Sequence, residues 1–514
     1  MQKIAAIDTG SNAIRLIVGE LKEDGRVEPI ENIRLPVRLG QDAFTTGLLR
    51  EETIQQGVDA FLHFRRVVDD LGVIKIRAIA TSALRETANS HIMLDRIQQT
   101  SGIEIEIING EEEARLIHLA VENAMELGNK RAVLIDIGGG SVEVTISENK
   151  RIISTESYNM GTVRLLKKLD GSNEKQTHLF GASNRPFSLL VREYAEAARR
   201  RIDREFGSEK IHLCIGTGGN VEEMGNLRQH LFKKSSDNVI TLGELQELIE
   251  KLSSMSVKDR IRKLKLKPDR ADVILPAAIV LQLIAHEAKV KEIRIPNVGL
   301  KDGILIEMAE ELARGPKLLR REQVWESAIR LGDKYQLDMN HATLTATMAG
   351  QVFDQSKPLH NLDEEHKLLL QVGSLLHDIG HFINTIDHDK HGYYILKNNP
   401  LIGLNENQQV IVASLIRYHR KAFPSLEDAN FKALPQKDRL IVMKLSALLR
   451  LADGMDMSHT ARVTKVTLAE KKKTWELTLH GKGDLMLEKW GLNKRRALFE
   501  EIFGVGLEIA DAKS

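Results

Sequence analysis

Two segments of this 514-residue sequence combine an aspartate with a glycine-rich turn. Residues 4–18 read IAAIDTGSNAIRLIV and residues 132–146 read AVLIDIGGGSVEVTI, so that Asp8 matches Asp136. Glycines let backbone N–H groups approach phosphate oxygens, and a neighbouring carboxylate can hold hydrated Mg²⁺. One copy alone would be consistent with a tight turn capped by its aspartate. Two copies favour a pair of phosphate-binding loops that clamp a polyphosphate from both sides.

Other residues of the same region could complete such a site. Residues 216–219 (GTGG) form a third glycine loop after a strand. Glu143 lies on the strand leaving the second loop, where it could share a metal with Asp136. One of the residues 111–113 (EEE) could activate a water as general base, although acidic residues also simply complement the dipole of a first helical turn. Arg85 could bind phosphate or lie on the surface.

The C-terminal part of the chain is rich in histidine. Eight of the 17 histidines fall between His341 and His419, where even spacing would put about three. A His, a His-Asp pair and an Asp on separate helical segments are typical of a metal site inside a helical bundle. Any one of these histidines could instead be a satisfied core residue. We predict a site for a divalent transition metal, with these candidate ligands: His341, His377, Asp378, His391, His419 and Asp453. Four others are expected to be structural or exposed: His360, His366, His381 and His388.

The composition excludes several classes of protein. Lys and Arg number 73 against 72 Asp and Glu, a formal net charge of +1, which excludes a polycationic nucleic-acid coat. Aromatic residues make up 4%, and none interleave the basic runs, so we expect no specific nucleic-acid partner. Cys214 is the only cysteine, which indicates a reducing compartment. We see no signal peptide and no apolar run of about 18 residues, and therefore expect a cytoplasmic protein without a membrane partner.

The hydrophobic pattern indicates which elements must position these residues. Strand-like and helix-like segments alternate over the first 300 residues, which favours an α/β class. Because the Asp-Gly hairpin recurs, we predict two similar α/β domains, over residues 1–125 and 126–303. Apolar residues at helical spacing predict an all-α domain over residues 304–460. The last stretch, residues 461–514, reads as a small α+β subdomain.

The first 310 residues resemble the exopolyphosphatase/guanosine pentaphosphate phosphohydrolase (Ppx/GppA) family. The resemblance depends on these motifs, in this order: IDTGSNAIRLIV, ATSALRETAN, IINGEEEARLIHLAV, LIDIGGGSVEV, MGTVRL, CIGTGGN and RIPNVGLKDGIL. It implies two ribonuclease-H-like domains of the actin and sugar-kinase superfold around a cleft. It also implies Mg²⁺-dependent release of a terminal phosphate and a homodimer.

The resemblance also implies roles for particular residues. Glu113 would be the general base and Arg85 would bind the attacked phosphate, while Asp136 and Glu143 would hold Mg²⁺ in the interdomain cleft. The phosphate loops would comprise Asp8, Ser11, Asn12, Gly138, Gly139, Gly140, Ser141, Gly216, Thr217 and Gly218. The third loop departs from the family pattern, which usually has Ser or Thr near its end where this chain reads GGN.

The histidine-rich region resembles the HD superfamily of metal-dependent phosphohydrolases. The resemblance implies that His341, the His377-Asp378 pair and Asp453 bind one metal, and that His391 and His419 add ligands for a second.

We expect inorganic polyphosphate as the substrate of the whole protein, because the extra C-terminal domain could extend an anion channel. Guanosine pentaphosphate is the first alternative. The second is that the N-terminal domains sense such an anion while the HD-type domain is the enzyme.

Overall fold

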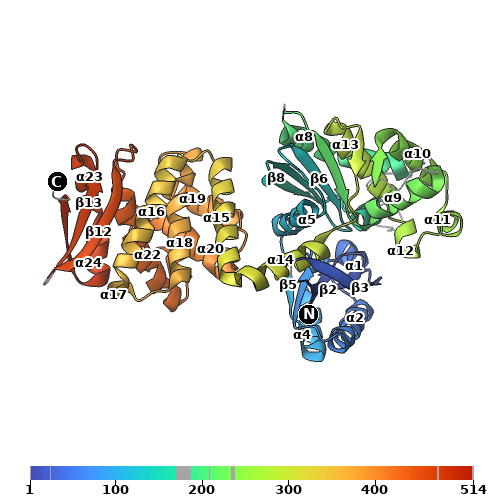
Figure 1. Cartoon of the computed structure of the whole chain (residues 1–514), viewed down its shortest axis with the longest axis horizontal. Helices are drawn as coiled ribbons and strands as arrows, with labels where there is room; N and C mark the ends of the chain where they lie inside the picture. Colours follow the sequence, from blue (N-terminus) through green and yellow to red (C-terminus); the bar gives the residue numbers. More distant parts are fainter. Residues whose placement is uncertain are drawn as a thin grey trace. The chain divides into compact units, whose positions relative to one another are not determined.

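The computed structural model describes residues 2–22, 25–169, 187–207, 209–232, 238–471 and 474–511. The chain forms two compact units, residues 1–315 and residues 316–514. Figure 1 shows the first as an α/β unit and the second as helices followed by a small sheet. Among the described helices, none is both long enough and apolar enough to cross a lipid bilayer.

The first unit contains two sheets in which the first four strands along the chain have the same order, and the second sheet has an additional antiparallel edge strand, β10. In the first sheet the order is β3-β2-β1-β4-β5, and its strands are β1 (Lys3–Thr9), β2 (Ile14–Leu21), β3 (Val27–Leu35), β4 (Lys75–Ala80) and β5 (Ile105–Ile107). In the second the order is β10-β11-β9-β6-β7-β8, and its strands are β6 (Ala132–Ile137), β7 (Val142–Glu148), β8 (Arg151–Tyr158), β9 (Leu213–Thr217), β10 (Val239–Thr241) and β11 (Glu292–Arg294). In each sheet three consecutive strands pair antiparallel, β1 to β3 in the first and β6 to β8 in the second. The first strand of each set, β1 or β6, is central and also pairs in parallel with the next strand along the sheet order, β4 or β9. This shared order confirms the internal duplication predicted from the two hairpins.

Helices cover both sheets. Those associated with the first sheet are α1 (Leu39–Thr46), α2 (Glu51–Asp70), α3 (Ser82–Arg85) and α4 (Ser90–Ser101), whereas α5 (Gly110–Ala124) contacts β6, β7 and β8 of the second sheet. Those associated with the second are α6 (Thr162–Leu169), α8 (Phe187–Phe206), α9 (Gly219–Phe232), α10 (Leu242–Ser253), α11 (Val257–Leu264), α12 (Pro268–Ala271) and α13 (Ile274–Glu287). The central strands β1 and β6 are buried almost throughout because both of their faces are covered, which explains why they read as continuous apolar runs.

Helix α14 (Leu300–Arg314) belongs to the first unit, although the sequence assigned most of it to the helical domain. One hydrophobic core joins Ile4 of β1, Leu134 of β6 and Ile304 of α14. Gly303 permits this packing, since an added Cβ there would lie 2.0 Å from the carbonyl oxygen of Leu116 in α5. The division between units therefore falls after residue 315 rather than after residue 303.

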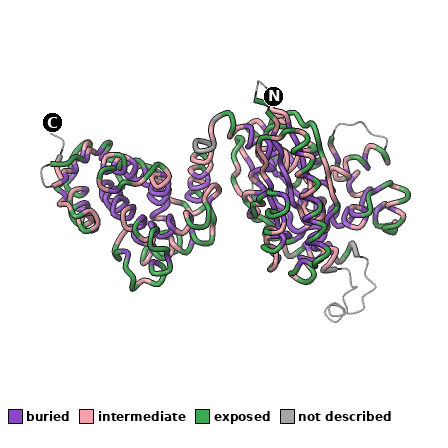
Figure 2. Tube along the Cα trace, turned by 90° about the horizontal axis from the view of Figure 1, so that it is seen from below, coloured by how far each residue is buried: buried purple, intermediate pink, exposed green. Residues whose placement is uncertain are grey.

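The second unit is built around one helical core. Its helices are α15 (Pro316–Lys334), α16 (Met339–Gln355), α17 (Lys357–His360), α18 (Glu364–Leu376), η1 (Ile379–Phe382), α19 (His388–Asn398), α20 (Glu406–Tyr418), α21 (Ala429–Lys432) and α22 (Gln436–Gly454). A three-stranded sheet follows, with strands β12 (Val463–Lys471), β13 (Thr474–Gly481) and β14 (Gly506–Asp511) and helices α23 (Met486–Arg495) and α24 (Ala497–Phe503). The sheet and the helices share a hydrophobic core, so the tail predicted over 461–514 is continuous with the helical part. Figure 2 shows buried residues along the core-facing sides of these helices.

Candidate functional site

The two Asp-Gly hairpins lie against each other in the first unit. Asp8 pairs with Arg15 across β1 and β2, and Asp136 pairs with Glu143 across β6 and β7. The turns are close: an added Cβ on Gly139 would lie 2.9 Å from the Cβ of Ser11. The structure thus brings together the two loops that the sequence predicted to clamp a phosphate chain.

Only one of the three consecutive glutamates at the start of helix α5 has its side chain buried beside the site. The side chain of Asn109 caps the helix by accepting the N–H of Glu112 at 2.8 Å. Glu111 is exposed, and Glu112 forms an ion pair with Arg115 at 2.7 Å. Glu113 alone is buried. Of residues 111–113, Glu113 is therefore the one whose side chain lies beside the loops.

Three buried carboxylates converge beside the loops. One ligand oxygen from each of Glu113, Asp136 and Glu143 lies within 4.8 Å of the others. Thr217 donates to Asp136 at 2.6 Å, and Ser157 donates to Glu143 at 2.8 Å. The Oε2 atoms of Glu113 and Glu143 are buried without a hydrogen-bond partner. Converging carboxylate oxygens with unused lone pairs fit a hydrated Mg²⁺ ion.

The protonation of these carboxylates supports the same interpretation. Burial raises the pKa of Glu113 well above its ordinary value, and the negative charges of Glu143 and Asp136 raise it further. Burial likewise raises the pKa of Asp136 to about 6 and that of Glu143, beside Asp136, to about 7. A divalent cation would lower all three pKa values because it favours the ionised carboxylates.

Most of the predicted phosphate-loop residues line one cavity in the first unit. The predicted residues on its wall are Asp8, Ser11, Asn12, Glu113, Asp136, Gly138, Gly139, Ser141 and Gly218. Gly219 and Asn220, on which the third loop departs from the family pattern, also line it. The predicted residues that do not reach its wall are Arg85, Gly140, Glu143, Gly216 and Thr217.

Those five residues take other positions. Glu143 belongs to the cluster of three carboxylates beside the cavity, and Thr217 donates a hydrogen bond to Asp136 of that cluster. The guanidinium of Arg85 donates to the carbonyl of Ile108 and lowers the pKa of Glu113 without facing the cavity. Gly216 packs among apolar side chains, and the carbonyl of Gly140 accepts a hydrogen bond from Arg164.

Four cationic residues on the cavity wall were not predicted: Arg15, Arg34, Arg270 and Lys301. The guanidinium groups of Arg15 and Arg270 both lie against Gly219, since an added Cβ there would be 2.6 Å from a nitrogen of each. Arg15 could have been found from the hairpin register that places it opposite Asp8. Arg270 belongs to the basic run over residues 258–272 (KDRIRKLKLKPDRAD), which reads equally well as a polyanion-binding stripe or as solvated surface. Together these cations place positive charge on the cavity wall, which suits the binding of phosphate groups.

Gly161 holds the second loop in place, and its replacement by alanine is expected to reduce both stability and activity. An added Cβ would lie 2.2 Å from the carbonyl carbon of Gly140 and 2.4 Å from the nitrogen of Ser141, so the loop backbone must move. We expect Gly161→Ala to lower the free energy of unfolding by about 1–3 kcal/mol and to weaken phosphate release in a steady-state assay. Gly243→Ala, with nothing within 4 Å of the new Cβ, is the control and should preserve both.

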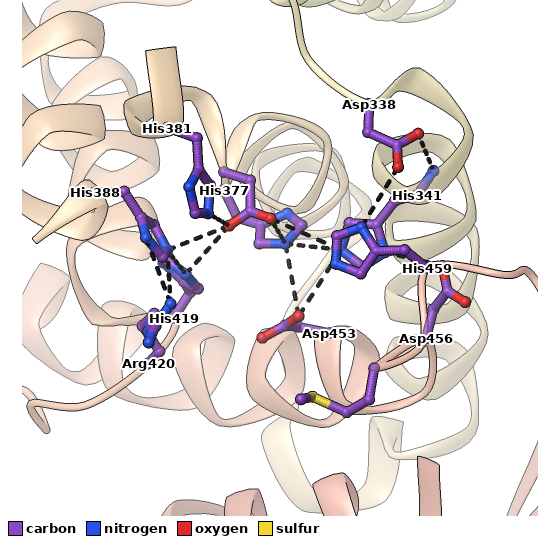
Figure 3. Close-up of polar contacts among 12 residues, drawn as sticks. Asp338, His341, His377, His381, His388, His419, Arg420, Asp453, Asp456 and His459 are labelled. Carbon is purple, nitrogen blue, oxygen red and sulfur yellow. Dashed lines mark hydrogen bonds and ion pairs between the residues drawn. The ribbon is translucent and has the colours of Figure 1, made fainter. Parts of the chain in front are cut away.

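A second cluster of chemically competent side chains lies within the second unit (Figure 3). His341 begins α16, His377 and Asp378 follow α18, and Asp453 lies near the end of α22. The Nε2 atoms of His341 and His377 are 3.2 Å apart, and they lie 3.9 and 3.7 Å from Oδ1 of Asp453. The structure therefore brings together the four residues predicted for a first metal.

Asp378 connects this group to two further histidines. Its Oδ2 is 3.6 Å from Nε2 of His377, whereas its Oδ1 is 3.3 Å from Nε2 of His388 and 3.7 Å from Nε2 of His419. The Nε2 atoms of His388 and His419 are 3.2 Å apart. One aspartate thus lies between two sets of ligand atoms, as in a site for two metals that share a carboxylate.

His388 occupies the place that the sequence gave to His391. His388 is buried in the cluster, while His391 is half-buried and has no contact with the cluster in the part of the chain that the structure describes. The buried residues of α19 include Gly392 and Leu396, and counting back four residues along this stripe marks His388. That spacing was the available signal. His381, also expected to be uninvolved, lies 3.5 Å from Oδ1 of Asp378.

Hydrogen bonds orient the four buried imidazoles toward the centre of the cluster. Nδ1 of His341 lies 2.9 Å from Oδ2 of Asp456, and Nδ1 of His377 lies 2.7 Å from a backbone carbonyl. Nδ1 of His388 and of His419 also lie at carbonyl oxygens, at 3.0 and 2.6 Å. When Nδ1 donates to oxygen, a neutral ring turns a bare Nε2 lone pair inward. Pairs of such nitrogens 3.2 Å apart need a proton or a cation between them, which fits bound metal.

The pKa values in the cluster place a proton on His377, and a bound metal would take over the positive charge of that proton. Burial opposes a charge on His377, but Asp378 and Asp453 outweigh it and raise its pKa to about 9. Burial and the charged His377 lower the pKa of His419 to about 3. Although burial opposes its ionisation, the histidines hold the pKa of Asp378 well below its ordinary value. A metal would displace the proton from His377, because metal ligation requires neutral imidazole.

Comparisons with known proteins place most of the chain in one family. Residues 18–312 match the model of the Ppx/GppA phosphatase family, and residues 325–495 match the model of Ppx/GppA phosphatase domain III. A guanosine-5'-triphosphate,3'-diphosphate pyrophosphatase from Vibrio parahaemolyticus is 27% identical over 87% of this chain and 86% of its own length. The protein of that name from Vibrio campbellii is 26% identical over 92% of each chain.

Solved structures agree on the fold of the α/β part. An exopolyphosphatase from Cytophaga hutchinsonii is 24% identical, with a TM-score of 0.54, and covers 60% of this chain and 98% of its own. A Ppx/GppA family member from Aquifex aeolicus is 22% identical, with a TM-score of 0.51 and the same coverage. Since the family model matches more than half of the sequence, the chain belongs to the Ppx/GppA phosphatase family, hydrolases of phosphoanhydride bonds.

Proposed function

We propose that this phosphatase removes the terminal 5'-phosphate of guanosine pentaphosphate, with inorganic polyphosphate as the second candidate substrate. From the sequence alone, polyphosphate is the first candidate. We reverse that order because relatives that align over 87–92% of this chain, at 26–27% identity, are named for guanosine-5'-triphosphate,3'-diphosphate, which is guanosine pentaphosphate. The exopolyphosphatase structure covers only 60% of the chain at 24% identity, which supports the fold and not the substrate.

The observation that carries the catalytic proposal is the buried, unpartnered Oε2 of Glu113 beside the two phosphate loops. An ionised Glu113 would accept the proton of the attacking water as general base. Backbone N–H groups of the glycine loops, together with Arg15 and Arg270, would orient the phosphate chain and neutralise its charge. Asp136 and Glu143 would hold a Mg²⁺ ion, which would contribute further charge neutralisation when bound.

The substrate preference is tested by measuring phosphate release from guanosine pentaphosphate and from long-chain polyphosphate under the same Mg²⁺ concentration. We expect kcat/KM for guanosine pentaphosphate to exceed that for polyphosphate ends by at least about tenfold, a difference of about 1.4 kcal/mol. The guanosine tetraphosphate product should accumulate without further hydrolysis. A higher kcat/KM on polyphosphate ends would reverse the order of the two substrates.

The second unit supports a second candidate function, that of a metal-dependent phosphohydrolase of the HD type. The supporting observation is the convergence of four inward-facing Nε2 atoms on Asp378 and Asp453, described above. The residues that would hold two divalent metals are His341, His377, Asp378, His388, His419 and Asp453. A chain purified without chelators should contain transition metal by elemental analysis, and metal-free protein under these conditions would contradict the proposal.

A further inference from the structure

Arg420 contacts the histidine cluster through its guanidinium. It follows His419 directly after α20, and its Nη1 lies 3.2 Å from Nε2 and 3.4 Å from Nδ1 of His388. Figure 3 shows it at the end of the cluster occupied by His388 and His419. Within the described part of the chain, no carboxylate lies at ion-pair distance from this half-buried guanidinium.

The other guanidiniums nearby all have oxygen acceptors. Arg495 pairs with Asp453 at 2.7 Å, and Arg417 pairs with Asp389. Arg450 donates to the carbonyl oxygens of Tyr418 at 2.9 Å and of Ala422 at 2.6 Å. A guanidinium carries five N–H donors and no acceptor. Among the described residues Arg420 contacts imidazole nitrogens of His388, so it retains donors for an anion.

If the cluster holds metal, the positive charge of Arg420 lies close to a second positive charge. A cation ligated by His388 would share that imidazole with the positive charge of Arg420, and like charges so close repel. A tetrahedral oxyanion removes the conflict, because its oxygens can ligate a metal and accept from the guanidinium fork at the same time. Phosphate is the oxyanion that the chemistry of this family produces and consumes.

We propose that Arg420 and the metal ligands His388 and His419 form a subsite for a phosphate oxyanion, either free orthophosphate or the phosphoryl group of an ester. The proposal rests on the metal site proposed above for the second unit. It assigns to Arg420 a binding role that neither family match specifies. Lys421, the next residue, is an exposed cation paired with Asp387 at 3.5 Å and serves as a matched control.

The test uses the full-length chain carrying Glu113→Gln, so that the first site does not hydrolyse added compounds. The protein is loaded with Co²⁺ in excess Mg²⁺, because the visible absorption of Co²⁺ reports nitrogen ligation and its response to anions. Orthophosphate should change this spectrum saturably. Arg420→Gln should keep its cobalt and raise the Kd for orthophosphate about 10- to 100-fold, as expected for charge-assisted hydrogen bonds. Lys421→Gln should bind like the parent.

The outcomes separate the two proposals. A parent chain that binds no cobalt would overturn the metal site and the subsite with it. Cobalt with no response to orthophosphate, or an unchanged Kd in Arg420→Gln, would overturn the subsite alone. If Arg420→Gln loses cobalt, Arg420→Lys should retain it and still bind orthophosphate more weakly than the parent, and parental affinity would overturn the subsite. Hydrolysis of 4-nitrophenyl phosphate that depends on Arg420 would identify an ester as the ligand, and tight orthophosphate binding without hydrolysis would identify the free anion.

Discussion

Replacing Glu113 by glutamine is expected to lower kcat for phosphate release by about 10²–10⁴-fold, the usual contribution of a general base. The substitution keeps the shape of the side chain and removes the lone pair that would accept a proton. Because Glu113 is buried and its Oε2 has no partner, no neighbouring group is positioned by a hydrogen bond to that atom. KM should therefore change much less than kcat in steady-state phosphate-release measurements.

The neighbouring glutamate provides the control. Glu111→Gln changes the same residue type on an exposed position two residues earlier and should retain wild-type kcat. The pH dependence gives a second readout. Burial and the adjacent carboxylates raise the pKa of Glu113, so the ionised base is lost as the pH falls through a value above the ordinary range of a glutamate. The acid limb of kcat/KM should shift to lower pH as Mg²⁺ increases, and Glu113→Gln with full activity would refute the assignment.

The candidate site of the first unit was largely predictable because its polar residues lie at the ends of short local patterns. Asp8 and Asp136 end apolar strands before glycine turns, and both the duplication and the loops follow from that repeat. What could not be predicted was which side chain faces the cavity. Arg85 lies in a matching motif yet donates to a backbone carbonyl, while Arg270 comes from a run that resembles ordinary surface. The direction in which a side chain faces depends on packing between segments far apart in the sequence, and local patterns do not encode that packing.

The same distinction explains the domain boundary. The apolar spacing of α14 correctly predicted a helix, but amphipathic spacing does not say which core the apolar face joins. The small residue Gly303 allows α14 to approach Leu116 of α5, and its apolar residues complete the core around β1 and β6. In the second unit, the sequence predicted the all-α part. The sheet after it, predicted as a separate subdomain, packs into the same core.

Replacing His388 by alanine is expected to remove bound metal, whereas replacing His391 is not. His388 is buried, its Nδ1 lies at a carbonyl oxygen, and its Nε2 lies 3.3 Å from Oδ1 of Asp378. Losing a direct ligand should weaken metal binding at this half of the cluster by more than the roughly 10–100-fold cost of losing an outer-shell partner. Elemental analysis should show about one metal fewer per chain than in the parent if the cluster holds two.

His391→Ala is a close comparison, since it removes the same side chain one turn further along α19 and leaves the cluster contacts intact. Its metal content should equal that of the parent. The opposite result, with metal lost from His391→Ala and retained in His388→Ala, would restore the ligand set predicted from the sequence and contradict the geometry of α19. Equal retention in both variants, with loss only in His377→Ala, would leave one metal at His341, His377 and Asp453 and exclude the second. The apolar stripe of α19 places His388, and not His391, toward the cluster. The two variants therefore test whether this orientation of the helix provides the ligand for a second metal.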